Sequence, residues 1–95
     1  MSQATTTVAH DEPARRFSVS LPGGIAVLAY ERNGDTLDLL HTSVPDSDEG
    51  KGHGSGLARA ALDHARTNKL KVIPSCPFVR AFIEKNPAYR DLVVA

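Results

Sequence analysis

The chain has 95 residues, of which 41% are apolar and 23% charged, and it contains no tryptophan. This length suits one domain, because typical domains have roughly 100–150 residues, and aliphatic side chains must build its core. Eleven basic residues balance eleven acidic ones. The sequence has no basic stripe interleaved with aromatic residues, which argues against nucleic acid as a partner. No apolar run approaches the ~20 residues of a membrane span, so no membrane partner is expected.

Residues 1–6 are polar and rich in threonine, and they are predicted to be disordered. Residues 1–10 lack the apolar stretch of a secretory signal. Residues 7–95 are predicted to form a single domain. The one cysteine, Cys76, excludes a disulfide within the chain and suits a reducing compartment. The sequence therefore predicts a cytoplasmic protein.

The first half of the chain predicts strands. Residues 8–9 predict the start of a short edge strand. From residue 17 to residue 21, apolar side chains alternate with serines, as in a strand with one buried face. Residues 22–24 read Pro-Gly-Gly and predict a turn. Residues 25–32 and 35–44 then carry the clearest strand patterns.

The strands over residues 25–32 and 35–44 are predicted to form a hairpin. Asn33-Gly34 joins them, and this pair favours a type I′ turn, in which both central residues have positive φ. A two-residue turn sets Arg32 opposite Asp35. It also places His41 on the same face as Leu39.

The second half predicts two helices with a strand between them. Residues 57–68 show apolar side chains at helical spacing. Residues 71–73 form a short strand, and Pro77 suits the first turn of the second helix. Arg80 and Glu84 are expected to pair on the outer face of that helix. Its apolar stripe comprises Phe78, Val79, Phe82 and Ile83. This order predicts an α+β fold, with helices packed on a mostly antiparallel sheet.

Glycines occupy positions 50, 52, 54 and 56, directly before the first predicted helix. A helix N-terminus carries partial positive charge and unpaired N–H groups, and glycines let an anion approach the backbone closely. The stretch therefore predicts a phosphate cradle, with a flexible loop as the alternative. A P-loop is excluded because Lys51 is followed by Gly52 and His53. A dinucleotide fingerprint is excluded because its third glycine and its acidic residue are missing.

The order of these motifs resembles the GCN5-related N-acetyltransferases. The acetyl-CoA motif of that superfamily leads from a strand through Arg/Gln-x-x-Gly-x-Gly/Ala into a helix, and Gly52 and Gly54 occupy its glycine positions. Residues 17–93 resemble more specifically the compact, single-domain YjdJ-type members. The residues that carry this longer resemblance are His41-Thr42-x-Val44-Pro45, Ile73-Pro74-Ser75-Cys76-Pro77-Phe78 and Asn86-Pro87-x-Tyr89.

The resemblance implies that coenzyme A lies along the strand that ends at Val44, with its pyrophosphate on backbone N–H groups and its thiol end near Cys76. The residues expected to contact it are Ser43, Val44, Gly52, His53, Gly54, Ser55, Gly56, Cys76 and Pro77. Two positions depart from the superfamily pattern. Glu49 stands where Arg or Gln is common, and Phe82 stands where a tyrosine often serves as general acid.

Several residues are candidates for chemistry. Cys76 lies where a helix dipole would favour a thiolate, so it is interpreted as a nucleophile, as a proton donor, or as a small buried hydrophobe. His41 is a candidate general base or a structural residue. Tyr89 can replace the missing acid or simply pack. His53 contacts phosphate or faces solvent, and no chemical role is expected for His64. No His, Cys, Asp and Glu cluster has zinc spacing, so no metal is expected.

The leading functional prediction is acetyl transfer from acetyl-CoA to a primary amine. A small polyamine, an amino acid and a protein lysine remain alternative acceptors. A non-catalytic module that binds coenzyme A or acyl-CoA is the main alternative, because the tyrosine acid is missing. A structural or interaction protein without this ligand is a third.

Overall fold

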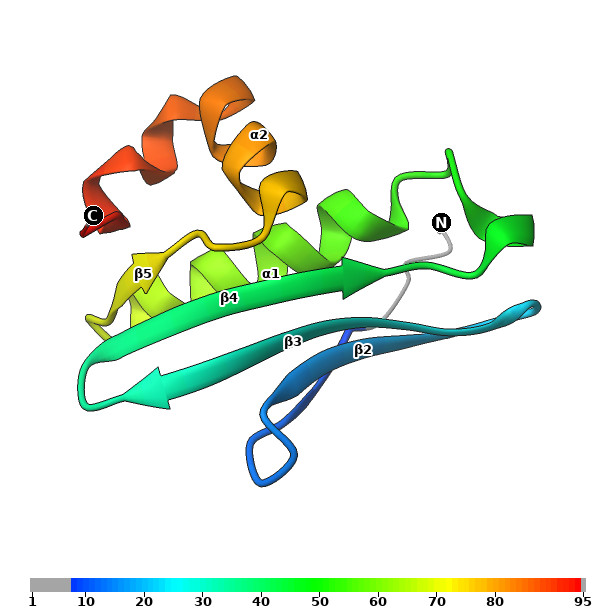
Figure 1. Cartoon of the computed structure of the whole chain (residues 1–95), viewed down its shortest axis with the longest axis horizontal. Coiled ribbons are helices and arrows are strands. Elements are labelled where there is room, and N and C mark those ends of the chain that lie inside the picture. The colour runs from blue at the N-terminus through cyan, green and yellow to red at the C-terminus, as the bar shows by residue number, and fades with distance from the viewer. Residues whose placement is uncertain (1–7, 95) are drawn as a thin grey trace.

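The computed structural model describes residues 8–94, so the predicted disordered segment, residues 1–6, lies outside it. The described chain forms one sheet with two α-helices packed on it (Figure 1). The strands are β1 (Ala9–Asp11), β2 (Arg16–Leu21), β3 (Gly24–Asn33), β4 (Thr36–Ser43) and β5 (Lys71–Ile73). The helices are α1 (His53–Thr67) and α2 (Pro77–Lys85), and the 3-10 turns are η1 (Asp46–Asp48) and η2 (Pro87–Leu92).

The sheet follows the chain in the order β1-β2-β3-β4-β5. Neighbouring strands are antiparallel from β1 to β4, whereas β4 and β5 are parallel, with α1 crossing between them. A further parallel bridge joins Val93 to Val72 of β5. The predicted α+β fold with a mostly antiparallel sheet is therefore confirmed.

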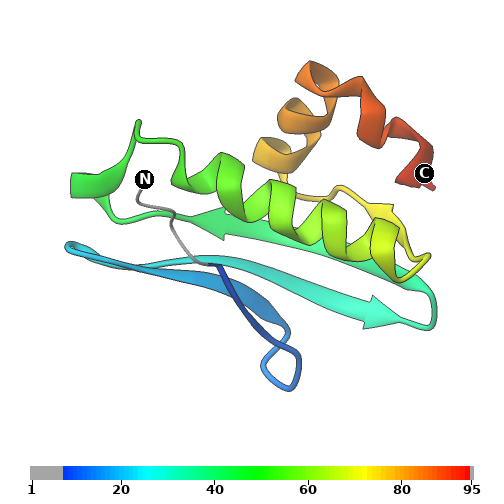
Figure 2. The same cartoon turned by 180° about the vertical axis from the view of Figure 1, so that it is seen from behind.

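One face of the sheet forms the core. In β3, Ala26, Leu28 and Tyr30 are buried, while the side chains between them are only half-buried, as a strand with one covered face requires. Leu57 and Ala61 of α1 are fully buried, because α1 runs lengthwise along that face (Figure 2). Burying each large aliphatic side chain contributes roughly 1.5–3 kcal/mol. The small alanines of α1 allow its close approach to the strands.

The turn between β3 and β4 differs from the predicted one. Asn33 pairs with Thr36, so the turn residues are Gly34 and Asp35, and the expected pairing of Arg32 with Asp35 is wrong. Gly34 has a φ of 60°, whereas Asn33 is not in the left-handed region. A glycine at the first turn position is what a type II′ turn takes, and this turn also suits the twist of a hairpin.

An extra residue in β4 also changes its pairing. Tyr30 pairs with Leu39, whereas Ala29 pairs with His41, so Leu40 is inserted between the two pairs. A bulge of this kind reverses the alternation of the strand. His41 is consequently exposed, and the expectation that it shares the buried face with Leu39 is wrong.

Helix α1 begins at His53, inside the glycine stretch, rather than at residue 57. Glycine and serine have low helix propensity, which made this segment look like a loop. Gly52 caps the helix with a φ of 85°, and the Gly56 N–H donates to the Gly52 carbonyl at 3.0 Å. This bond closes the first turn and draws the glycine stretch into the helix.

Helix α2 begins at Pro77, which confirms the position predicted for this residue. Two other side chains of α2 differ from the prediction. Phe78 was expected in the apolar stripe, yet it is 43% exposed, because the first turn of α2 extends beyond the core. Arg80 donates to the carbonyls of Pro74 and Ser75, at 3.3 and 3.4 Å, in place of the expected pairing with Glu84. These bonds fasten the loop before α2 to the helix itself.

Candidate functional site

Strands β4 and β5 part halfway along β4. Their ladder joins Thr36–Asp38 to Lys71–Ile73, and beyond it the Cys76 N–H donates to the Leu39 carbonyl at 2.8 Å. The chain then turns into α2, while β4 continues to Ser43 (Figure 1). The second half of β4 therefore has no strand beside it on the β5 side within the described chain.

A cavity of about 320 Å³ lies against this end of β4. It is bounded by the end of β4, the loop around η1, the first turn of α1 and one aromatic side chain of α2. Its lining residues are Thr42, Val44, Asp48, Glu49, Gly50, His53, Gly54 and Phe78. The cavity thus lies where the predicted ligand strand meets the predicted phosphate cradle.

The first turn of α1 presents a positive helix end to this cavity. The N–H groups of His53, Gly54 and Ser55 come too early in α1 to have a partner one turn back within the helix. The Gly56 N–H, by contrast, is bonded to Gly52. No acidic side chain lies in the first turn, so the partial positive charge of the dipole is not offset there. The donors available to an anion are therefore fewer than the predicted run from Gly52 to Gly56.

Phe78 closes one side of the cavity by lying over Gly54. A Cβ atom at Gly54 would stand 2.9 Å from Phe78 Cζ, which is closer than such atoms approach. Gly54 is therefore needed for the contact between the two helices as well as for access to the backbone. Helical spacing predicted Phe78 in the apolar stripe of α2 and did not indicate this role. The signal was Pro77, which puts Phe78 in the first, projecting turn of α2.

Two carboxylates line the cavity beside the helix end. Asp48 is 3% exposed and accepts a hydrogen bond from the Gly23 N–H at 3.1 Å. Lys51 Nζ lies 3.9 Å from Asp48 Oδ1 and offsets part of its charge. Glu49 is exposed. Asp48 was not singled out from the sequence, because nothing in an acidic loop distinguishes the residue that folds inward.

Some of the residues predicted to contact coenzyme A line a cavity or hollow at this end of α1, and others do not. Val44, His53 and Gly54 line the cavity. Gly52 and Gly56, again with His53, line a smaller hollow of about 160 Å³ beside the same helix end. His53 is half-buried between the two spaces, which favours the predicted contact with a ligand over a fully solvated position. The predicted residues that line neither space are Ser43, Ser55, Cys76 and Pro77.

Cys76 caps α2, as predicted, but its thiol is buried. The residue is 2% exposed, and its Sγ lies 3.5 Å from Oγ1 of Thr42, which lines the cavity. Cys76 therefore supports the cavity wall through Thr42. This placement favours the small buried hydrophobe among the three predicted roles.

Tyr89, the candidate acid, lies away from the cavity, and Phe82 offers no acid in its place. The Tyr89 hydroxyl donates to Asp63 Oδ1 at 2.7 Å, and burial, followed by this bond, raises the pKa of Tyr89. Asp63 lies ten residues beyond His53 on α1, or roughly 15 Å along the helix. Phe82 is 7% exposed, with the Arg59 guanidinium 5.3 Å from its ring centroid. Tyr89 thus fits the packing role that was its alternative.

No helix among residues 8–94 combines the length and the apolar character that crossing a membrane requires.

Comparison with known proteins identifies the family. Residues 16–92 match the family model described as GCN5-related N-acetyl-transferase. The protein NATD1 of Xenopus tropicalis is 42% identical over 83 residues, which cover 84% of this chain and 76% of that protein. NATD1 of Mus musculus has the same identity and coverage.

A solved structure supports the same assignment. The NMR structure of a GCN5-like protein from Staphylococcus aureus superposes with a TM-score of 0.73 at 28% identity, covering 98% of this chain and 92% of that one. The narrower resemblance to YjdJ-type members stays a prediction. On the family match, the sequence relatives and the shared fold together, the chain belongs to the GCN5-related N-acetyl-transferases.

Proposed function

We propose that the chain binds acetyl-CoA in the cavity at the end of β4 and transfers its acetyl group to a primary amine. The observation that carries the proposal is the meeting, at one cavity, of an open strand end and a helix N-terminus with no acidic side chain in its first turn. Membership of an acetyltransferase family supplies the class of reaction. The cavity supplies a place for it.

Each part of the ligand has a matching surface. The pyrophosphate would lie on the N–H groups of the first turn of α1, where backbone donors and the helix dipole favour an anion. The pantetheine arm, which carries amides, would follow the open edge of β4 past Thr42 and Val44. Phe78 offers the arm an apolar wall. The thioester would then point towards the place where β4 and β5 part.

The proposed reaction needs the protein to position the two reactants and to polarise the thioester carbonyl. The amine nitrogen attacks the thioester carbonyl, a tetrahedral intermediate forms, and the C–S bond breaks to release the thiolate of coenzyme A. Holding the two reactants together lowers the entropic cost, and N–H groups on the strand edge would polarise the carbonyl. Glu49 and His53 line the cavity at its pyrophosphate end, so the amine passes its proton through solvent water rather than to either of them. That proton neutralises the departing thiolate.

Calorimetric titration with acetyl-CoA tests the binding step, with one ligand per chain as the expected result. Glu49→Gln removes a negative charge beside the pyrophosphate and should tighten binding by about threefold to tenfold. Glu84→Gln removes a charge from α2 outside the cavity lining and should leave the affinity unchanged. Absence of binding would refute the proposal, and so would an equal effect of both variants.

Release of free thiol from acetyl-CoA in the presence of a panel of amines tests the transfer step. Thiol release that depends on the amine is expected, together with an acetylated amine identified by mass spectrometry.

A non-catalytic module that binds acyl-CoA is the second candidate. Two observations favour it: Phe82 stands buried where a tyrosine acid is common, and the Tyr89 hydroxyl is bonded to Asp63. The same two experiments separate the candidates. Binding of acetyl-CoA without thiol release, across polyamines, amino acids and lysine peptides, would establish the module and refute the transferase.

A further inference from the structure

A second group of ionisable side chains lies far from the cavity. His10 of β1, Glu12 of the following turn and His64 of α1 each offer a ligand atom, and these atoms lie within 4.8 Å of one another. His64 is eleven residues beyond His53 on α1, or roughly 16 Å along the helix axis. The group therefore shares neither residues nor space with the proposed coenzyme site.

His10 is held firmly in this group. Its ring stacks on Phe17, with centroids 4.1 Å apart and planes 5° from parallel. Its Nε2 lies 2.6 Å from the Tyr30 hydroxyl, a hydrogen bond that fixes the plane of the imidazole. Phe17 and Tyr30 are both buried in the core. The ring is thus oriented by packing on one side and by a hydrogen bond at its edge.

His64 is positioned from the helix. Its ring stands edge-on to that of His10, with centroids 4.4 Å apart. Asn68, one turn later, places its amide nitrogen 3.3 Å from His64 Nδ1, which restrains the ring. The Asn68 amide nitrogen also bonds the His64 carbonyl and can only donate, so Nδ1 accepts here and this contact must open before the ring binds an ion. The ring of His10 is therefore oriented in advance, whereas the ring of His64 must turn from Asn68 to the ion.

We propose that His10, Glu12 and His64 bind Zn²⁺, with water in the fourth position. Two histidines and one glutamate are a ligand set that zinc uses, and an open fourth position is common in such sites. Bonds of about 2 Å in tetrahedral geometry put ligand atoms about 3.3 Å apart, so the side chains must close by up to roughly 1.5 Å. Glu12 is exposed and can make most of that movement.

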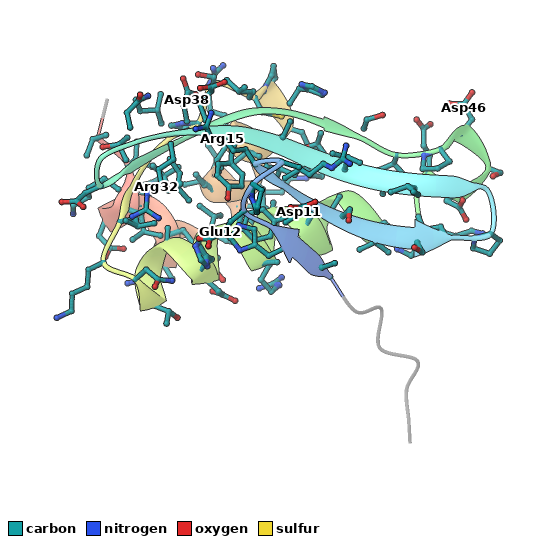
Figure 3. All side chains as sticks on the ribbon, turned by 90° about the horizontal axis from the view of Figure 1, so that it is seen from below. Asp11, Glu12, Arg15, Arg32, Asp38 and Asp46 are labelled. Carbon is teal, nitrogen blue, oxygen red and sulfur yellow. The ribbon has the colours of Figure 1, made fainter. Side chains whose placement is uncertain are left out.

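The site is accessible from solvent. An open hollow of about 470 Å³ is lined by Glu12 and Tyr30 together with Arg15, Arg32 and Gly34. Figure 3 shows Glu12, Arg15 and Arg32 gathered in one region, well away from Asp46 at the other end of the sheet. Of the three ligand residues, Glu12 lines this hollow, so an ion can approach the group along the Glu12 carboxylate. The two arginines would also suit an anionic group beside the ion.

The expected effect of the ion is to fasten the sheet edge to α1. β1 has three residues and pairs with β2. Bonds from one ion to His10, Glu12 and His64 would tie this short strand and the turn after it to α1. Ions that bind the native state but not the unfolded chain stabilise it by mass action. Zn²⁺ should therefore raise the thermal midpoint of unfolding.

Titration of the chain, without any histidine tag, with Zn²⁺ in a non-chelating buffer tests the site. One ion per chain should bind, and Mg²⁺ should not, because this hard cation prefers oxygen ligands. Co²⁺ should give the visible absorption of a tetrahedral complex. Glu12→Gln and His64→Ala each remove a direct ligand. Each should therefore weaken Zn²⁺ binding at least ~100-fold, which is the upper limit for the loss of an outer partner alone. Glu12 is exposed, so its variant keeps the fold.

Matched controls come from the same chain. His41→Ala and Glu84→Gln remove an exposed histidine and an exposed glutamate elsewhere, and they should leave the affinity unchanged. In an NMR spectrum of the imidazole nitrogens, Zn²⁺ should shift the signals of His10 and His64 but not those of His41 and His53. Absence of stoichiometric binding would overturn the proposal. So would binding that survives both ligand variants, or that the controls weaken equally, since the ion would then be adventitious.

Discussion

Gly54 and Gly56, both in the first turns of α1, differ in what a methyl group would meet. A Cβ at Gly54 would stand 2.9 Å from the Phe78 ring, whereas a Cβ at Gly56 has nothing within 4 Å. Neither residue has a positive φ. A side chain at Gly54 therefore disturbs the contact between the two helices.

The contrast predicts opposite outcomes for two conservative changes. Gly56→Ala should raise the free energy of unfolding by about 0.5–1 kcal/mol, because glycine is costly inside a helix. Gly54→Ala should gain less or destabilise, because the Phe78 ring must move. Urea denaturation measures both effects. In a Phe78→Ala background, Gly54→Ala should recover the gain. Equal gains for the two variants in the original background would contradict this account.

The two tyrosines predict a change in stability at high pH. Burial is the largest cause that raises the pKa of Tyr30 and of Tyr89 above the ordinary value of 10.0. Between pH 10 and the folded pKa values, the native state therefore holds more protons than the unfolded chain. The free energy of unfolding should accordingly fall as the pH rises above about 10.

Tyrosinate absorbance measures this titration directly. The folded protein should ionise its tyrosines above pH 10, and denaturant should return the transition to the ordinary value. Tyr89→Phe assigns the two signals. A folded protein that titrates at the unfolded value would show that the hydroxyls are not desolvated.

Burial of Cys76 predicts slow modification. At 2% exposure, the thiol should react with iodoacetamide only when the start of α2 opens, and it should react rapidly in denaturant. If acetyl-CoA binds as proposed, saturating coenzyme A should slow the native reaction further, because Thr42 joins the thiol to the cavity wall. Cys76→Ala should keep the affinity, as a supporting residue would. Equal rates of modification of the folded protein with and without coenzyme A would show that Cys76 does not support the site.

At the scale of elements, the 3-10 turn η1 is attached to the β2–β3 turn by one side chain. Asp48 accepts a hydrogen bond from the Gly23 N–H, and a Cβ at Gly23 would clash with Ser47 Oγ, so the two segments are in close contact. Asp48→Ala should cost about 1–3 kcal/mol, because it leaves a backbone donor unpaired. Asp46→Ala, at an exposed site in the same turn, should cost almost nothing. Thermal or urea unfolding compares the two, and similar losses would contradict the attachment.

The sequence predicted which elements exist better than how they join. The alternation in β2 identified its core face correctly, since a single covered face imposes a period of two. The bulge at Leu40 was not predictable, because no local signal marks an inserted residue, and it moved His41 to the other face. The start of α1 was set too late, because tertiary contact with Phe78 overrides the weak propensity of glycine.

At the scale of the whole molecule, the sequence predicted the location of the candidate cavity because its parts are consecutive. A strand, a glycine stretch and a helix start meet wherever such a chain folds, and Val44, His53 and Gly54, which were predicted to contact coenzyme A, line the cavity. Groups assembled from distant segments were not predictable. His10 and His64 are 54 positions apart, and their contact depends on how α1 lies across the sheet. Phe78 was not predictable at the cavity for the same reason, because α2 brings it there from a distant part of the chain.

The parting of β4 and β5 also has a consequence for self-association. Unpaired strand edges are templates on which other chains can add. β1 is too short to act as one, and Val93 covers part of β5. The end of β4 remains open, with Leu40, 37% exposed, close to where the strands part. The opening that would admit a ligand is thus also where aggregation can begin. Leu40→Lys would place a charge at this open edge, and light scattering of heated samples should show slower aggregation for this variant.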